Sequence, residues 1–170
     1  MEVYEVMRRR RSIREFTPDP IPPAALERIC EAVRLAPTAC NLQPFKFLLI
    51  QSPEKHAAVC DCYKRGTWLA TAPLIVVALG NRETAWKRLD GTPAHVIDTS
   101  IALEHLVLAA TSEGLVTCWI CAFDQDALHQ ALGLGPEWEV VAMTPVGYPN
   151  PAAEPRPFAR KSISELFQTI

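Results

Sequence analysis

Residues 8–16, RRRRSIREF, set four consecutive arginines, a serine and a further arginine just ahead of a proline-rich stretch. Guanidinium groups stay charged at any working pH and bind phosphate oxygens through two parallel hydrogen bonds. Arg10, Arg11 and Arg14, together with the hydroxyl of Ser12, therefore predict a compact clamp for a dianionic phosphate. The alternative is a solvated basic helix face, since basic runs of this length also serve as nucleic-acid or targeting patches.

A second polar segment lies at residues 36–50, APTACNLQPFKFLLI. Pro37 ends the preceding helical pattern, and Thr38, Asn41 and Gln43 follow in a turn before an apolar run. Asn and Gln side chains each offer a donor beside an acceptor, which suits a heterocycle edge with alternating N–H, C=O and ring-nitrogen groups. The edge of an isoalloxazine, the ring system of a flavin, fits that description. The alternative is that these side chains only close turns or lie at the surface.

Together the two segments resemble the nitroreductase family of FMN-dependent oxidoreductases. The resemblance continues in the same order through TAPLIVVALGN at residues 71–81, DTSIALEHLVLAATSEGLVTCWICAFD at residues 98–124 and TPVGYPNP at residues 144–151. It ends with Arg160 and Lys161 before SISELF. The resemblance implies the α+β class, with a three-layer α/β/α sandwich around a mostly antiparallel central sheet and an interlocked homodimer.

The same resemblance implies a function. It predicts an FMN-dependent NAD(P)H oxidoreductase that passes a hydride from NADH or NADPH through flavin N5 to a planar electron-poor acceptor, such as a nitroaromatic or a quinone, by a ping-pong mechanism. The flavin performs the chemistry, so the resemblance implies neither a catalytic side chain nor a metal. The choice between NADH and NADPH stays open, because no residue that would read the ribose can be placed.

The cofactor-binding residues carry over from the family in three groups. At the phosphate and ribityl end the resemblance implies Arg10, Arg11, Ser12 and Arg14, with Arg160 or Lys161 from the tail. The other subunit would bring Pro37, Thr38, Ala39, Asn41 and Gln43 to the ring. The ring would also be lined by Ile120, Cys121 and Ala122, with a backbone N–H near Cys121 directed at flavin N5. Cys40 departs from the family pattern, because many relatives carry glycine there.

The composition indicates one globular domain over residues 1–170. Hydrophobic residues make up 49% and charged residues 21% of the chain, which is typical of a folded protein. The longest apolar runs fall far short of the ~18 residues that cross a bilayer, and the amino terminus lacks the apolar core of a secretory signal. We therefore expect a cytoplasmic protein with no membrane contact. A net charge of −2 argues against a nucleic-acid partner.

Two other kinds of cofactor site are disfavoured. The close glycine pair Gly133 and Gly135 runs into Pro136, so the chain has neither a dinucleotide-binding fingerprint nor a Walker loop. The pairs Cys60/Cys62 and Cys118/Cys121 are close in sequence. Cys118 and Cys121, however, lie in a run predicted as a strand, where residues three apart point to opposite faces. We expect these cysteines to be small buried hydrophobic residues, and keep a dithiol pair or a zinc-stabilised binding module as alternatives.

Periodicity and turn residues predict the secondary structure. Helices are expected over residues 2–10, 24–35, 53–64, 97–113 and 125–132, and strands over residues 45–50, 73–80, 116–122 and 139–146. The helix over residues 97–113 is apolar nearly all round and should be the central buried helix. The prolines after Tyr148 predict an extended tail, and in the resembled family the tail, residues 149–170, wraps the partner subunit.

Some alternatives to the main function remain. One is a member of the same superfamily with another flavin chemistry, such as flavin fragmentation, dehalogenation or azoline oxidation, and another is a non-catalytic FMN-binding or carrier protein. The short stretch 81–95 leaves little room for a lid, so we expect an open pocket in which Trp86 is either a stacking wall or a packing residue. The four histidines have no evident carboxylate or serine partner, which predicts structural or surface roles.

Overall fold

A four-stranded antiparallel sheet forms the middle layer of the computed structural model, which describes residues 2–153 and 158–170. Its strands lie in the order β1-β2-β4-β3. The bounds of these strands are β1 (Phe45–Ile50), β2 (Leu74–Asn81), β3 (Val116–Thr117) and β4 (Trp138–Gly147). Strands β2 and β4 fill the centre, while β1 and β3 form the two edges. Every residue of β2 is buried, because it has a neighbouring strand on each side and a helical layer on each face.

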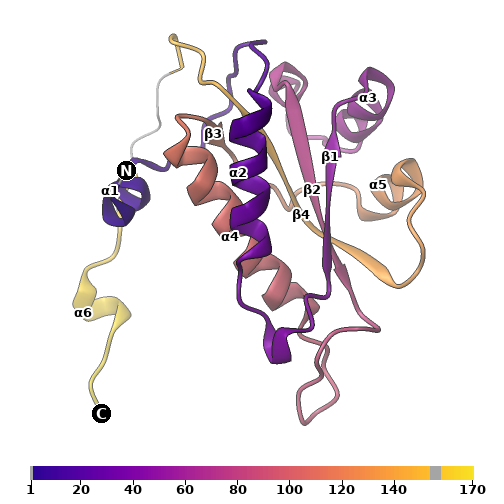
Figure 1. The fold of residues 1–170 in the computed structure, drawn as a ribbon, viewed down its shortest axis with the longest axis vertical. Coiled ribbons are helices and arrows are strands. Elements are labelled where there is room, and N and C mark those ends of the chain that lie inside the picture. Colours follow the sequence, from indigo (N-terminus) through magenta and orange to yellow (C-terminus); the bar gives the residue numbers. More distant parts are fainter. Residues whose placement is uncertain (1, 154–157) are drawn as a thin grey trace.

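Helices cover both faces of this sheet (Figure 1). On one face lie α2 (Pro23–Arg34) and α4 (His95–Ser112), and on the other lie α3 (Pro53–Asp61) and α5 (Gln125–Leu132). The alternation of β2 divides the core accordingly. On the face covered by α2 and α4 lie the side chains of Leu74, Val76 and Ala78. On the opposite face lie those of Ile75, Val77 and Leu79. The predicted three-layer sandwich is confirmed.

Shorter elements complete the chain. Helix α1 (Val3–Arg9) packs against α4, and two 3₁₀ turns, η1 (Ala39–Asn41) and η2 (Trp68–Thr71), precede β1 and β2. The last part of the tail, from residue 158 on, lies apart from the body of the molecule (Figure 1) and contains a short helix, α6 (Ile163–Leu166). This part of the tail is therefore not wholly extended as predicted. Pro155 and Pro157, on which that prediction partly rested, lie outside the described residues.

Local signals set several helix ends where the sequence placed them. Pro23 is the first residue of α2, as its fixed φ and missing N–H favour. The side chain of Asp124 caps α5 by accepting a hydrogen bond from the amide of Ala127. Gly133 ends that helix in the left-handed conformation, with φ of 66°. The predicted bounds of α5 and β1 are confirmed. Apart from the strand predicted over residues 116–122, the other predicted elements start and end within a few residues of their prediction.

Strand β3 is shorter than the predicted strand over residues 116–122. The regular ladder between β3 and β4 ends at Thr117, and the next amide, that of Cys118, donates to the side-chain hydroxyl of Thr144. Pairing with β4 resumes as a single bridge between Ile120 and Met143. The apolar run misled the prediction, because it resembles a continuous buried strand.

We predict that Leu103→Ala will destabilise the protein by about 2–5 kcal/mol, because it removes a core side chain and leaves a cavity. Leu103 is in the middle of α4 and is 0% exposed. Urea denaturation followed by far-ultraviolet circular dichroism would measure the change. Leu89→Ala is the control, since Leu89 is fully exposed and its loss should change stability by less than about 0.5 kcal/mol. Equal effects of the two variants would contradict this description of the core.

Candidate functional site

The arginine segment follows α1 and lies along the β3 edge of the sheet. Ser12 forms a parallel bridge with Thr117, and the amide of Ile13 donates to the Thr117 carbonyl at 3.0 Å. Ile13 is buried, so alternation along this extended segment turns Ser12 and Arg14 toward the outside. The Ser12 residue is exposed and the Arg14 side chain lies near the ring of Trp68, 5.9 Å from its centroid.

The individual arginines of this segment differ in their contacts. Arg11 folds back on the end of α1, where its Nη1 donates to the carbonyl oxygens of Arg8 and Arg10. Those carbonyls lie at the negative end of a helix and lack helical partners, so a guanidinium is favourable there. Arg10 is half-buried beside α4. Desolvation raises the pKa of Glu104 on α4, and the nearby charge of Arg10 acts in the opposite direction.

An aromatic ring brings the tail to the arginine segment. The guanidinium carbons of Arg11 and Arg160 lie 4.0 and 4.4 Å from the centroid of the Phe158 ring. This is cation–π geometry, and it brings together two of the predicted phosphate-binding residues within one chain. Lys161 is exposed beside them. Sequence reasoning missed Phe158, although an aromatic residue two positions before Arg160 was the available signal.

The loop Thr38–Gln43 has an unusual backbone. Cys40, Asn41 and Gln43 have φ values of 51°, 56° and 50°. Side chains disfavour this left-handed region, at a cost on the order of 1–3 kcal/mol for each residue, although Asn tolerates it better than most. Glycine adopts this conformation without strain, which fits the expectation, from the family resemblance, of glycine at the position of Cys40.

Hydrogen bonds within this loop bring its polar side chains together. The Thr38 hydroxyl accepts from the Gln43 amide at 3.0 Å, and Gln43 Nε2 donates to both the carbonyl and Oδ1 of Asn41 at 3.1 Å. Asn41 and Gln43 are exposed. The two amide side chains predicted to meet a heterocycle therefore lie next to each other at the surface.

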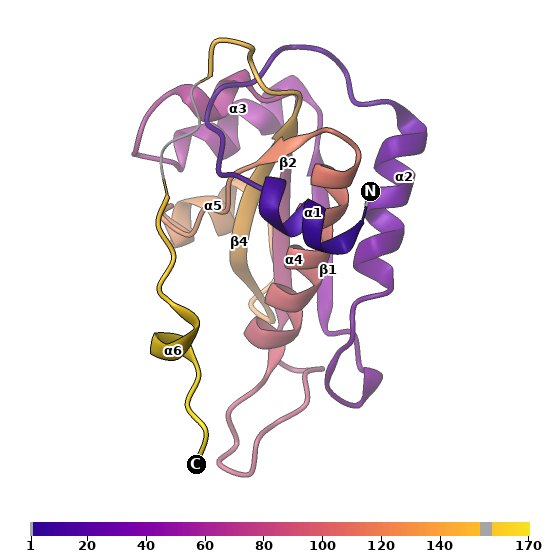
Figure 2. The ribbon, with the colours of Figure 1, turned by 90° about the vertical axis from the view of Figure 1, so that its left-hand side faces the viewer.

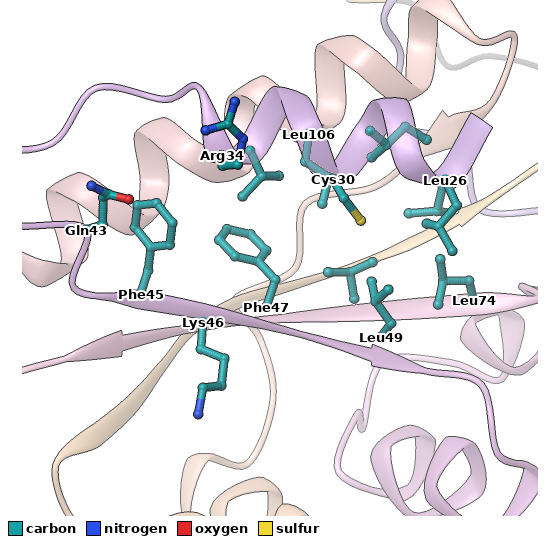
Figure 3. A pocket seen from close by; sticks show the side chains of 14 residues that line it. Leu26, Cys30, Arg34, Gln43, Phe45, Lys46, Phe47, Leu49, Leu74 and Leu106 are labelled. Carbon is teal, nitrogen blue, oxygen red and sulfur yellow. The ribbon is translucent and has the colours of Figure 1, made fainter. Parts of the chain in front are cut away.

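An apolar cavity of about 310 Å³ lies next to this loop, between α2 and β1. Figure 3 shows Leu26 and Cys30 of α2 on one wall and Phe45 and Phe47 of β1 on the other. Gln43 lies at one end of this cavity and is the predicted site residue that lines it. The other predicted site residues do not line it, so this cavity alone does not unite the candidate site.

The segment after β3 presents two of the three predicted ring-lining residues. Ile120 is buried and exchanges two backbone hydrogen bonds with Met143, of 2.9 and 3.0 Å. Cys121 and Ala122 are exposed, and the indole N–H of Trp119 donates to Cys121 Sγ at 3.2 Å. The Cys121 amide donates to no group in the described part of the chain, so it is available to a ligand.

The two halves of the predicted site are separate within one chain. In Figures 1 and 2 the loop that follows α2 lies toward one end of the molecule, well away from α1 and the segment after it. The arginine segment does lie beside the strand that leads to Cys121, through the bridge from Ser12 to Thr117. One chain thus brings the arginines close to the exposed segment after β3, but not to Asn41 and Gln43.

His95 has a carboxylate partner that sequence reasoning did not find. Its Nε2–H donates to Glu139 Oε2 at 2.9 Å, and Arg82 Nε donates to the same oxygen at 2.9 Å. Burial raises the pKa of Glu139, but the hydrogen bonds from His95 and Arg82 outweigh this effect and the pKa is lowered. This partner was not evident in the sequence, because Glu139 lies 44 positions away from His95. His95 is 4% exposed, in agreement with its predicted structural role.

The cysteines follow the prediction only in part. Cys62 and Cys118 are buried, whereas Cys121 is exposed, so the prediction of burial is wrong for Cys121. The Cys60 thiol lies 3.7 Å from His56 Nδ1, but burial raises its pKa, which disfavours a reactive thiolate. Over residues 2–153 and 158–170, no group of three or more His, Cys, Asp or Glu side chains is placed to hold a metal ion.

Within the described ranges, no helix combines the length and the apolar character needed to span a bilayer.

Comparisons with known proteins identify relatives of this chain in sequence and in fold. A sequence model of the nitroreductase family matches residues 7–61 and 58–148. The chain is 27% identical to an NADH dehydrogenase of Thermus thermophilus, with 83% of each protein covered, and 25% identical to iodotyrosine deiodinase 1 of Rattus norvegicus, covering 99% of this chain and 70% of the relative.

A solved structure of a nitroreductase family protein from Clostridium novyi NT superposes with a TM-score of 0.84 at 34% identity, covering 89% of this chain and 87% of the other. Sequence and fold therefore agree over most of the chain, and this protein belongs to the nitroreductase family.

Proposed function

We propose that this protein is an FMN-dependent NAD(P)H oxidoreductase whose acceptor is a planar electron-poor compound of the nitroaromatic or quinone type, reduced by a ping-pong mechanism. The observation that carries the proposal is the bridge from Ser12 to Thr117, which sets the arginine segment beside the strand leading to Cys121. Similarity to an NADH dehydrogenase supports a redox function with a nicotinamide donor.

The donor set at the β3 edge fits a phosphate. Ser12 is exposed and Arg14 projects from the same side of its extended segment, so a hydroxyl and a guanidinium face outward together. Arg10 adds a second cation from the end of α1. Arg11 already donates to two carbonyls, so we assign the phosphate chiefly to Arg10, Ser12 and Arg14. Arg160 and Lys161 are supporting cations from the tail.

Other exposed groups fit a planar heterocycle. The Cys121 amide is a free donor on the exposed segment after β3, and the small side chain of Ala122 allows a flat ring to approach. Asn41 and Gln43 offer adjacent side-chain amides. Pro37, Thr38 and Ala39 form the start of the same loop. FMN, when bound, supplies the hydride relay between nicotinamide and acceptor. The residues of the protein bind and orient the reactants.

We propose that the two halves of the site meet in a homodimer. The loop Thr38–Gln43 of one chain would complete the arginine half of another, and the tail over residues 149–170 would wrap the partner. The exposed apolar surface of the tail supports this arrangement. Ile163 is 79% and Phe167 75% exposed in the single chain, and burying such side chains against a partner favours association.

A second candidate is a related flavin chemistry, and the similarity to iodotyrosine deiodinase 1 favours dehalogenation among these. Against it, the hairpin between β2 and α4 is short, with its tip closed by a hydrogen bond from the Arg88 amide to the Thr92 carbonyl. Trp86 on this hairpin is 40% exposed and could stack on a planar acceptor. A non-catalytic FMN carrier is the third candidate.

The visible absorption spectrum of the protein with FMN tests these candidates directly. We expect bound flavin that bleaches anaerobically with NADH or NADPH and recovers when a nitroaromatic or quinone is added. Bound flavin that neither nucleotide bleaches would favour the carrier, and recovery only with an iodinated phenol would favour dehalogenation. Failure to bind FMN at all would overturn the proposed function.

Replacing Arg10 or Arg14, the two cations assigned to the phosphate, should weaken FMN binding. Each charge-assisted contact to phosphate contributes about 1.5–3 kcal/mol, so we expect Arg10→Ala and Arg14→Ala each to raise the FMN dissociation constant about 10- to 100-fold. Fluorescence titration measures it. Arg9→Ala is the matched control from the same arginine run, because Arg9 is exposed and paired with Glu5 at 2.7 Å. Equal FMN affinity in all three variants would refute the phosphate clamp.

The dimer can be tested in the tail itself. The double change Ile163→Ser and Phe167→Ser should shift the protein from dimer to monomer, since it removes the two apolar anchors of the exposed tail. Sedimentation velocity over a range of concentrations measures the shift. Gln168→Ser, at another exposed tail position, should leave the dimer intact. A dimer that is unaffected by the double change would exclude the tail as an important part of the interface.

A further inference from the structure

Asp98 is a buried acid that the proposed function does not yet use. It lies in the first turn of α4 and is 2% exposed. Its Oδ1 accepts a hydrogen bond from the Ala39 amide at 3.1 Å, while Oδ2 is buried without a hydrogen-bond partner among the described residues. Burying a carboxylate is unfavourable unless it is well paired. A role in helix stability alone would be served as well by an exposed acid near the helix N-terminus.

The partner of Asp98 is the start of the left-handed loop. A backbone with positive φ at Cys40, Asn41 and Gln43 persists only where the surroundings fix it. The bonds between Thr38, Asn41 and Gln43 are internal to the loop, so they do not fix its position on the protein. The Asp98 bond ties the beginning of the loop to α4, and the Asn81 amide, which donates to the Pro44 carbonyl at 2.8 Å, ties its end to β2.

We propose that Asp98 is a positioning residue that holds the loop Thr38–Gln43 in its left-handed shape, so that the Asn41 and Gln43 amides are arranged in advance for a planar heterocycle. The use of those amides rests on the proposed function, but the clamp itself does not. Without the clamp, only a fraction of molecules would present the two amides correctly. The apparent affinity for the ring would then be the intrinsic affinity multiplied by that fraction.

Two substitutions separate the hydrogen bond from the charge. Asp98→Asn keeps an oxygen that can accept from the Ala39 amide, but removes the charge. Asp98→Ala removes both. Thr99→Val is the matched control, because Thr99 is the next residue, is 0% exposed and also has an unpartnered buried oxygen, Oγ1. Its replacement by an apolar side chain of similar shape touches the same part of α4 but not the loop.

Hydrogen exchange of the Ala39 amide, with no FMN added, tests the clamp directly. We expect the amide to be protected in the native protein, in Asp98→Asn and in Thr99→Val, and its protection to fall by about 10-fold or more in Asp98→Ala. Equal protection in Asp98→Ala and the native protein would overturn the clamp. This measurement tests the clamp even if the protein does not bind FMN.

The positioning role is tested by the visible circular dichroism of bound FMN and by its dissociation constant. Asp98→Ala should raise that constant about tenfold and change the dichroism of the flavin bands, with both restored in Asp98→Asn. A purely structural role would lower the melting temperature and leave the bands of the bound flavin unchanged. That result, or a loss in Asp98→Asn as large as in Asp98→Ala, would overturn the proposal.

Discussion

The burial of β2 on both faces is the constraint on which the rest of the structure depends. Its aliphatic side chains alternate between two cores, so a helical layer is required on each side. The contact with α4 is close: a side chain at Gly80 would bring its Cβ within 2.9 Å of His95 and 3.0 Å of Thr99. This packing fixes the first turn of α4, and with it the position of Asp98.

The candidate site is formed at two places on this sheet and its helices: the β3 edge, and the turn between α2 and β1. At the β3 edge, the regular ladder ends at Thr117, and the Thr144 hydroxyl accepts a hydrogen bond from the Cys118 amide. The chain beyond then runs partly free of the sheet, which leaves Cys121 and Ala122 exposed beside the arginine segment. At the end of α2, the chain must reverse into β1 through a left-handed loop held to α4. Both halves of the site are thus departures from regular structure.

Local patterns predicted most of the fold, because alternation, caps and prolines act over a few residues. The bounds of β1 and α5 agree with the structure for this reason. Contacts between distant residues were not predictable in this way. His95 and Glu139 are 44 positions apart, and Ala39 and Asp98 are 59 positions apart. The candidate site residues came from a family resemblance. Phe158 lies outside its motifs, and Asp98 opens the motif over residues 98–124 without an implied role, so both were found only from the structure.

The separation of the two half-sites has a thermodynamic consequence for the proposed dimer. The outward groups at Ser12 and Arg14 and the amides of Asn41 and Gln43 are presented at separate surfaces of one chain. A ligand that contacts both sets must bridge two chains, so it binds the dimer more tightly than the monomer. By linkage, the same ligand then stabilises the dimer by an equal free energy. Cofactor affinity and subunit association would therefore depend on one another, and each would vary with protein concentration.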